Sequence, residues 1–200
     1  MIERSRFEHQ LFHLRKIILD GVSYFIVWQG LTREYEDSIQ NLGQHTGFWW
    51  QYRGFFAPAR NALLWSTLMQ LSKAFDRNPR TVSLSNLLVT ARNNPTELAP
   101  HATQDGLADI QIKIYKNIEL LRRLRRYRNQ RLVHFDAELM DNIELPSGEV
   151  KTLIEETKSI YNSIKFSCEG KYDDFDNIME NVCLHTSQVI SIMTEGEKYS

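Results

Sequence analysis

Hydrophobic residues recur at three- and four-residue steps along most of this chain, and such spacing predicts amphipathic helices. One stripe of them runs from Val150 to Ile164, and a second runs from Phe175 to Met193. Ser147 and Glu149 are residue types suited to the start of the first of these helices. The pattern predicts two antiparallel helices joined near Gly170.

The middle of the chain contains two further helical patterns. Residues 57–75 are strongly apolar, with Pro58 near the first turn, where a proline is tolerated. This pattern must end at Asn78-Pro79, because the residue before a proline disfavours helical backbone. The next segment, residues 83–94, predicts a short helix capped by Ser83 or Ser85.

The remaining segments complete an all-helical prediction. Residues 94–100 read as a loop, and the longest uninterrupted helical pattern runs from about Gln104 to Leu132. The first 40 residues read as one or two more helices, and we find no alternating run typical of a strand. We therefore expect an all-α antiparallel helical bundle of about five to seven helices, forming a single domain over residues 1–200.

Charge is distributed unevenly along a chain whose net formal charge is only −1. Residues 1–135 hold 19 Lys and Arg against 11 Asp and Glu, whereas residues 136–200 hold 5 against 14. The basic section suits a polyanionic partner, and it equally suits packing against the acidic section.

Two features of the sequence predict a cytoplasmic protein with no membrane segment. Cys168 and Cys183 form neither a disulfide framework nor a metal or redox motif, so free thiols in a reducing compartment are expected. The apolar stretch near the N-terminus is interrupted by Asp20 and Gly21 and is too short to span a bilayer.

The long helical pattern ends in a cluster of arginines, which supply six of the ten residues from Arg122 to Arg131. On a helical wheel one side of this helix is apolar. That side is formed by Leu107, Ile110, Ile114, Ile118, Leu121 and Leu132. The wheel places Arg125 in the middle of the apolar side and Arg128 and Asn129 at its margins. It places Arg122 beside them and turns Arg123 and Arg126 outward.

Arginines on an apolar helix face require a partner, because burying an unpaired charge is strongly disfavoured. One interpretation is structural: carboxylates of the acidic C-terminal helices pair with them. The other is functional: they line a polar cleft that receives an anion. His134 follows the cluster, and an imidazole near arginines tends toward its neutral form, which a general base requires.

The segment "RNQRLVH" has the form R-N-x(4)-H and resembles the R-x(4–6)-H signature of the HEPN superfamily of helical domains. A wider likeness comes from "ALLWSTLMQLSKAFDRNPRTVSLSNLL" and from the "H-x-D" formed by His134, Phe135 and Asp136. Both are similar to the abortive-infection U branch of these domains. The resemblance covers roughly residues 10 to 190.

The resemblance implies a metal-independent endoribonuclease that acts as a toxin or antiphage effector, without a metal or other cofactor. Arg128 would bind the scissile phosphate, His134 would transfer protons, and Asn129 would orient one of them or contact the phosphate. Flanking phosphates would be held by Arg122, Arg125 and Arg131. The implied partners are RNA, an antitoxin protein and a second copy of the chain, which would complete a composite site across a two-fold axis.

Two other classes of function stay open on the sequence. The first is a non-catalytic module that binds a nucleotide, a nucleic acid or a protein through the arginines and does not need His134. The second is a plain structural bundle in which the basic helix pairs with its own acidic helices. Arg128 together with His134 distinguishes the catalytic interpretation from both.

Three minor features have ordinary explanations. His9 and His13 stand four residues apart on a helix, a spacing that can bind metal, but no carboxylate accompanies them as in H-E-x-x-H. The aromatics of "FWWQYRGFF" could stack on bases, although such residues more often form a core or a dimer interface. Negative charge that favours a helix dipole is supplied by Asp173, Asp174 and Asp176.

Overall fold

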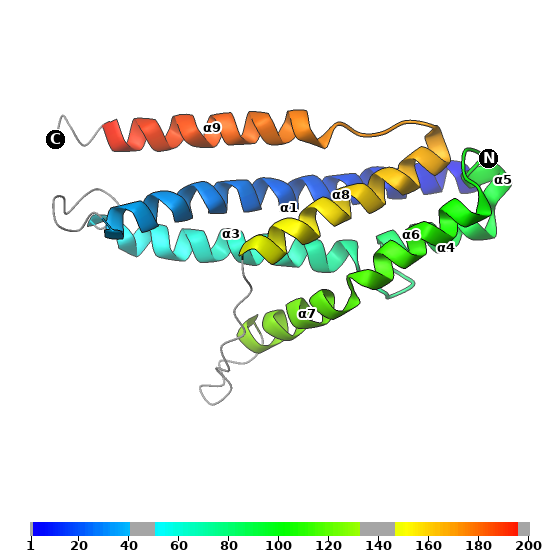
Figure 1. The fold of residues 1–200 in the computed structure, drawn as a ribbon, viewed down its shortest axis with the longest axis horizontal. Helices are drawn as coiled ribbons and strands as arrows, with labels where there is room; N and C mark the ends of the chain where they lie inside the picture. The colour runs from blue at the N-terminus through cyan, green and yellow to red at the C-terminus, as the bar shows by residue number, and fades with distance from the viewer. Residues whose placement is uncertain (1, 41–50, 133–146, 196–200) are drawn as a thin grey trace. The chain divides into compact units, whose positions relative to one another are not determined.

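The computed structural model describes residues 2–40, 51–132 and 147–195, which form eight helical segments and no strand (Figure 1). The segments are α1 (Ile2–Gln40), α3 (Arg53–Ala74), α4 (Leu84–Asn93), α5 (Pro95–Leu98), α6 (Gln104–Lys116), α7 (Ile118–Leu132), α8 (Ser147–Glu169) and α9 (Phe175–Glu195). The all-α prediction is confirmed.

Two segments differ from the sequence prediction and raise the number of helices in the described residues above five to seven. The expected loop at residues 94–100 contains α5, a single turn that begins at Pro95, where the missing proline N–H costs no hydrogen bond. The expected helix from Gln104 to Leu132 is broken at Asn117, which separates α6 from α7. The first 40 residues, by contrast, hold one continuous helix.

The chain divides into two compact units, each assembled from two stretches of sequence. Unit 1 comprises Met1–Asp20 and Leu68–Asp173, and unit 2 comprises Gly21–Thr67 and Asp174–Ser200. Helices α1 and α3 each supply residues to both units. The single domain predicted for residues 1–200 stays a prediction.

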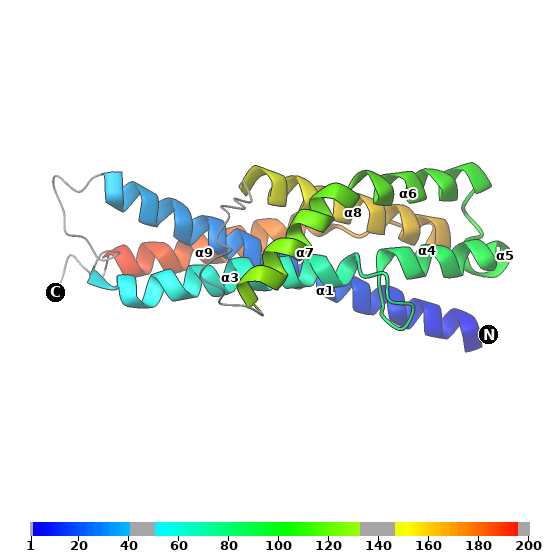
Figure 2. The same ribbon diagram turned by 90° about the horizontal axis from the view of Figure 1, so that it is seen from below.

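Unit 1 is built around α4, α6 and α8, which pack on one another (Figures 1 and 2). Each helix contributes apolar residues at helical spacing, and the burial of these residues drives the packing. The most deeply buried side chains of the three helices include Leu84, Leu87, Leu88, Leu107, Ile110, Ile114, Leu153, Ile154, Ile160 and Tyr161. This packing fixes α6, the helix that leads into the arginine cluster.

Unit 2 has a smaller core, where Leu31 of α1, Phe56 of α3 and Ile190 of α9 meet. Gly30 permits α9 to approach α1 closely within this unit. A Cβ atom at Gly30 would lie 2.9 Å from the Cγ2 atom of Thr186, which is closer than packed atoms tolerate. None of the described helices is both long enough and apolar enough to cross a membrane.

Candidate active site on the arginine helix

Helix α7 carries the arginine cluster and is held in unit 1 by its own leucines. Leu121 and Leu124 are buried, and they continue the buried row that Leu107, Ile110 and Ile114 form in α6. The burial predicted for the apolar side is therefore confirmed at four positions, whereas Ile118 is only half-buried. Leu124 was not among the predicted buried residues, although it follows Leu121 at the same helical spacing.

The break at Asn117 separates α6 from α7 without changing which side of the helix faces the core. The Asn117 backbone N–H donates to the carbonyl oxygens of both Ile114 and Tyr115, and its side-chain amide donates to the Lys113 carbonyl at 3.0 Å. Its backbone dihedrals, φ −87° and ψ 0°, still lie in the right-handed helical region. The buried side of the helix therefore continues from α6 into α7, and Asn117 itself is buried between Ile114 and Leu121.

Two arginines of the cluster already have carboxylate partners within unit 1. Arg122 pairs with Glu119, three residues earlier on the same helix, and both side chains are well exposed. Arg123 lies 2.8 Å (Nη2 to Oε2) from Glu149 in the first turn of α8. The structural interpretation of the cluster, in which acidic C-terminal helices neutralise it, thus holds at Arg123.

The pairing of Arg123 corrects one expectation, since the wheel turned this residue outward. Its side chain is only 42% exposed and reaches across to α8. The Glu149 oxygen that it meets is buried and accepts no hydrogen bond from the described residues. The contact is therefore an electrostatic pair without the alignment of a hydrogen bond.

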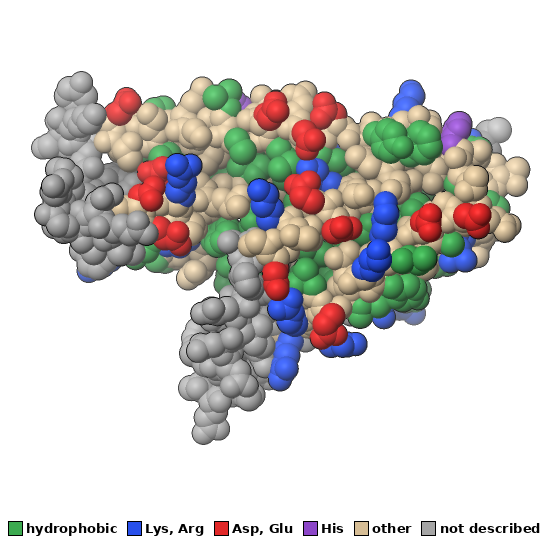
Figure 3. All heavy atoms as spheres, in the orientation of Figure 1, with side chains coloured by type: hydrophobic (Ala, Val, Ile, Leu, Met, Phe, Trp, Pro, Cys, Tyr) green, Lys and Arg blue, Asp and Glu red, His purple; other side chains and the backbone are tan. Residues whose placement is uncertain are grey.

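Arg126, also predicted to point outward, is exposed. The other four predicted residues on the helix, Arg125, Arg128, Asn129 and Arg131, lie on α7, and their side chains fall outside the described residues. His134 also lies outside them. Figure 3 shows Lys and Arg side chains over α7 with Asp and Glu side chains beside them.

The arginine-rich sequence of α7 suits contact with phosphate groups. Guanidinium groups form forked, charge-assisted hydrogen bonds with phosphate oxygens, and Arg122 and Arg126 are exposed on this helix.

The segment "DRNPRTVSL", which belongs to the family resemblance, forms an ordered turn between α3 and α4. The Asp76 side chain accepts from the Asn78 N–H at 3.1 Å, and the Asn78 side chain accepts from the Arg80 N–H at 3.0 Å. Asn86 of α4 donates to the carbonyl oxygens of Asn78 and Thr81 at 2.7 and 2.8 Å. These residues fix the turn, so their occurrence in the sequence has a structural cause.

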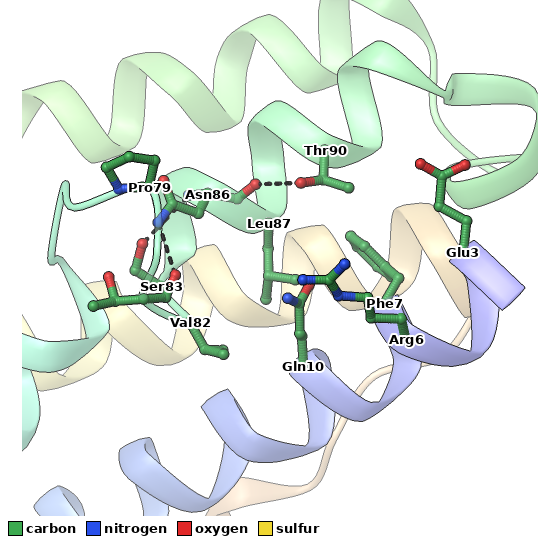
Figure 4. Close-up of a pocket in the computed structure, with 11 residues that line it drawn as sticks. Glu3, Arg6, Phe7, Gln10, Pro79, Val82, Ser83, Asn86, Leu87 and Thr90 are labelled. Carbon is green, nitrogen blue, oxygen red and sulfur yellow. Dashed lines mark hydrogen bonds between the residues drawn. The ribbon is translucent and has the colours of Figure 1, made fainter.

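A cavity of about 250 Å³ opens between this turn and α1 (Figure 4). Residues at i, i+3, i+4 and i+7 line it on each helix. They are Glu3, Arg6, Phe7 and Gln10 of α1 and, beginning at the cap of α4, Ser83, Asn86, Leu87 and Thr90. Several of its polar groups serve unit 1 itself: Asn86 holds the turn, and the Thr90 hydroxyl donates to the Asn86 carbonyl. Among the described residues, none of those that line this cavity belongs to α7.

Asp173 is the centre of a charged cluster that the sequence did not reveal. Its carboxylate lies 3.0 Å from the Arg15 guanidinium of α1 and 2.8 Å from the Lys165 ammonium of α8. Burial alone would raise the pKa of Asp173, but hydrogen bonds from Lys165 and Tyr161 and the positive charges of Lys165 and Arg15 hold it below its ordinary value. The pKa of Tyr161 is raised by burial and then by the Asp173 charge.

The helix-dipole explanation therefore holds for two of the three aspartates and not for Asp173. Asp174 fits it, because its side chain accepts from the Asn177 N–H at the start of α9. Asp176 lies in the first turn of α9, where negative charge is favourable. Asp173 instead ties the end of unit 1 together, and its partner Arg15 is 158 residues away in the sequence.

The remaining candidates are the histidine pair near the N-terminus and the aromatic segment. The rings of His9 and His13 meet edge to face with centroids 4.8 Å apart. No group of three His, Cys, Asp or Glu residues capable of holding a metal occurs in the part of the chain that the structure describes. In the aromatic segment Phe56 belongs to the core of unit 2, whereas Phe55 is exposed. Phe48, Trp49 and Trp50 lie outside the described residues.

Comparison with known proteins gives one match. The family model HEPN AbiU2, described as AbiU2, matches residues 6–187. No curated protein and no solved structure matches the chain.

Proposed function

The chain belongs to the AbiU2 family of HEPN domains, and we propose that it is a metal-independent endoribonuclease that acts as a toxin or antiphage effector in abortive infection. The observation that carries this proposal is the family match over residues 6–187, together with R-N-x(4)-H beginning at Arg128 on α7. The family name implies abortive infection; cleavage of RNA is our inference from the motif.

In the proposed reaction the ribose 2′-hydroxyl attacks the adjacent phosphorus, and the bond from phosphorus to the 5′-oxygen breaks. One proton leaves the 2′-hydroxyl and one reaches the departing 5′-oxygen. An imidazole suits either transfer, because its ordinary pKa is near neutrality. The products are a 2′,3′-cyclic phosphate and a 5′-hydroxyl, and the requirement for a 2′-hydroxyl restricts the reaction to RNA.

The residues of the motif take distinct parts in this reaction. His134 transfers a proton, and Arg128 binds the scissile phosphate and stabilises the additional negative charge of the transition state. Asn129 orients one of them or contacts the phosphate. Arg122, Arg125 and Arg131 bind flanking phosphates. The exposure of Arg122 and Arg126 on α7 supports contact between this helix and a polyanion.

We propose that the acting form is a homodimer with both copies of "RNQRLVH" near its two-fold axis. Each chain holds one Arg128 and one His134, which is a sparse set for two proton transfers. A composite site would supply a second imidazole. An antitoxin protein that covers the arginines is the proposed means of restraint.

The experiment that tests the function compares the parent protein with His134→Ala on total RNA, with and without EDTA. We expect the parent to cleave equally in both conditions and His134→Ala to be inactive while still binding RNA. His185→Ala is the matched control, because His185 is an exposed histidine of α9 in unit 2. If His134→Ala cleaves as fast as the parent, the catalytic assignment fails and the non-catalytic binding module replaces it.

Arg128 provides the second arm of this test. Arg128→Ala should lower both RNA affinity and cleavage, since it removes a phosphate contact in the ground state and in the transition state. The loss in the transition state should be on the order of 2–4 kcal/mol. Arg128→Lys keeps the charge but not the forked geometry, so it should restore binding better than it restores cleavage. Equal recovery of both quantities would contradict the assigned role.

A further inference from the structure

A row of exposed side chains follows α6 into α7 on one side of unit 1. It consists of Ile112, Tyr115, Glu119, Arg122 and Arg126, at successive steps of three, four, three and four residues. Ile112 is 52% exposed and Tyr115 is 55% exposed, so two large side chains at the start of the row are open to solvent. Arg126 stands two residues before Arg128, where the R-N-x(4)-H motif begins in the sequence.

The break at Asn117 does not interrupt this row. Asn117 is buried, in line with Ile114 and Leu121 on the opposite, core-facing side. Because its backbone remains in the helical region, the exposed residues before and after it stay on the solvent side. From Tyr115 to Arg126 the row is about 16 Å long, at a helical rise of ~1.5 Å per residue.

The chemistry of the row suits a single strand of RNA. An exposed aromatic ring can stack on any base, and the adjacent cations can meet the phosphates on either side of it. Lys116 lies next to Tyr115, and Arg126 is the exposed cation nearest the motif. Arg122 is paired with Glu119, but both side chains are about 70% exposed. Such a pair is worth little in water, so a phosphate can displace the carboxylate.

We propose that this row is an RNA-binding subsite outside the cleavage motif, in which Tyr115 stacks on a base and Lys116, Arg122 and Arg126 bind the neighbouring phosphates. The proposal rests on the proposed function, because it names how the same substrate is held. It assigns to Glu119 an opposing part: its negative charge lies in the path of the phosphate chain and weakens binding.

Binding is best measured with a fluorescent single-stranded RNA oligonucleotide and the His134→Ala protein, so that the probe is not cleaved. Adding Tyr115→Ala should weaken binding about fivefold or more, which is at the low end of the loss expected for one stacked base. Tyr115→Phe should bind like the His134→Ala parent, because the ring is retained. Tyr172→Ala is the matched control, since Tyr172 is 64% exposed in the same unit but lies outside the row.

Two further measurements separate stacking from charge. Glu119→Gln should strengthen binding two- to threefold at low salt, and Arg126→Ala should weaken it in a manner that fades as salt rises. The effect of Tyr115→Ala should persist at high salt. A duplex RNA of the same sequence should bind without any dependence on Tyr115, because its bases are not available for stacking.

These measurements distinguish failure of the RNA-binding subsite from failure of the proposed function. If RNA binds but Tyr115→Ala and Tyr172→Ala behave alike, the subsite is wrong and the proposed function stands. If the protein with Tyr115 intact binds no RNA, both proposals are overturned. If duplex binding depends on Tyr115 as strongly as single-strand binding does, stacking on a base is wrong.

Discussion

Unit 1 contains two groups of basic residues, and they meet their carboxylates in different ways. Arg15 and Lys165 converge on Asp173, and the side chains of Lys165 and Asp173 are only 16% and 13% exposed. On α7, Arg122 and Arg123 pair with Glu119 and Glu149 through side chains that are 35% to 70% exposed. The first group joins α1, α8 and the end of unit 1, whereas in the second group Arg122 pairs within α7 and Arg123 reaches across to α8.

The difference shows which charges can serve a ligand. Opening the Asp173 cluster would leave a charge in a poorly solvated place, which is costly. Opening an exposed pair on α7 costs little, because water replaces the lost partner. A polyanion could therefore take Arg122 from Glu119, but it could not take Arg15 and Lys165 from Asp173.

Breaking the buried cluster should give the largest effect on stability. Asp173→Asn should lower the free energy of unfolding by about 2–3 kcal/mol, because Arg15 and Lys165 would keep their charges without the carboxylate. Urea unfolding followed by circular dichroism would measure it. Asp176→Asn is the control, since Asp176 is exposed in the first turn of α9, and it should cost no more than about 0.5 kcal/mol. Equal losses would mean that Asp173 is as dispensable as an exposed carboxylate.

Protonation of Asp173 at low pH should remove the same contribution to the free energy of unfolding that Asp173→Asn removes. The pKa of Asp173 is lower in the folded chain than its ordinary value of 3.8, so the folded state favours the charged form. The stabilisation is therefore complete above the pKa of the unfolded chain and is lost as pH falls through the folded-state pKa. The difference in unfolding free energy between the parent and Asp173→Asn should shrink in urea titrations repeated from pH 7 down to pH 3. A constant difference would contradict this assignment.

Substitutions of Arg122 and Arg123 on α7 should have the smallest effects on stability, and the two effects should differ. Arg123→Ala should cost about 0.5–1 kcal/mol in unfolding free energy, since it releases the half-exposed Glu149 of α8. Arg122→Ala should cost less than that and should weaken RNA binding at low salt instead. A double-mutant cycle with Glu149→Gln would measure the coupling of Arg123 to α8. Absence of coupling would place Arg123 with Arg122 as a ligand-facing residue.

The sequence predicts local features of the fold well where a short-range cause determines them. Ser83 caps α4 as expected, with its hydroxyl accepting from the Asn86 N–H at 3.3 Å. Gly170, with φ at 68°, ends α8 where the joint was expected. The break at Asn117 was not predicted, because the hydrophobic spacing continues through it. The break is marked only by the Asn117 N–H, which donates to the carbonyl oxygens of both Ile114 and Tyr115.

A helical wheel predicts which residues share one side of a helix, but it does not predict their partners on other helices. The arginine-rich helix and its motif can be read from the sequence, but the wheel assumed one axis from Gln104 to Leu132. A wheel describes one helix alone, so it could not show that Arg123 reaches Glu149 on α8. The partners Glu149 and Asp173 could not be predicted either, because tertiary packing alone brings α8 against α7 and Arg15 against the end of unit 1.

The sharing of α1 and α3 between the two units has a consequence for inheritance. Unit 1 encloses the first part of unit 2 in the sequence, so no single position divides the gene into one unit and the other. A truncation that removes the C-terminal stretch of unit 2 deletes α9 and with it Ile190 of that core. Recombination that transfers the arginine helix with all of unit 1 in one piece therefore carries residues 21–67 of unit 2 with it.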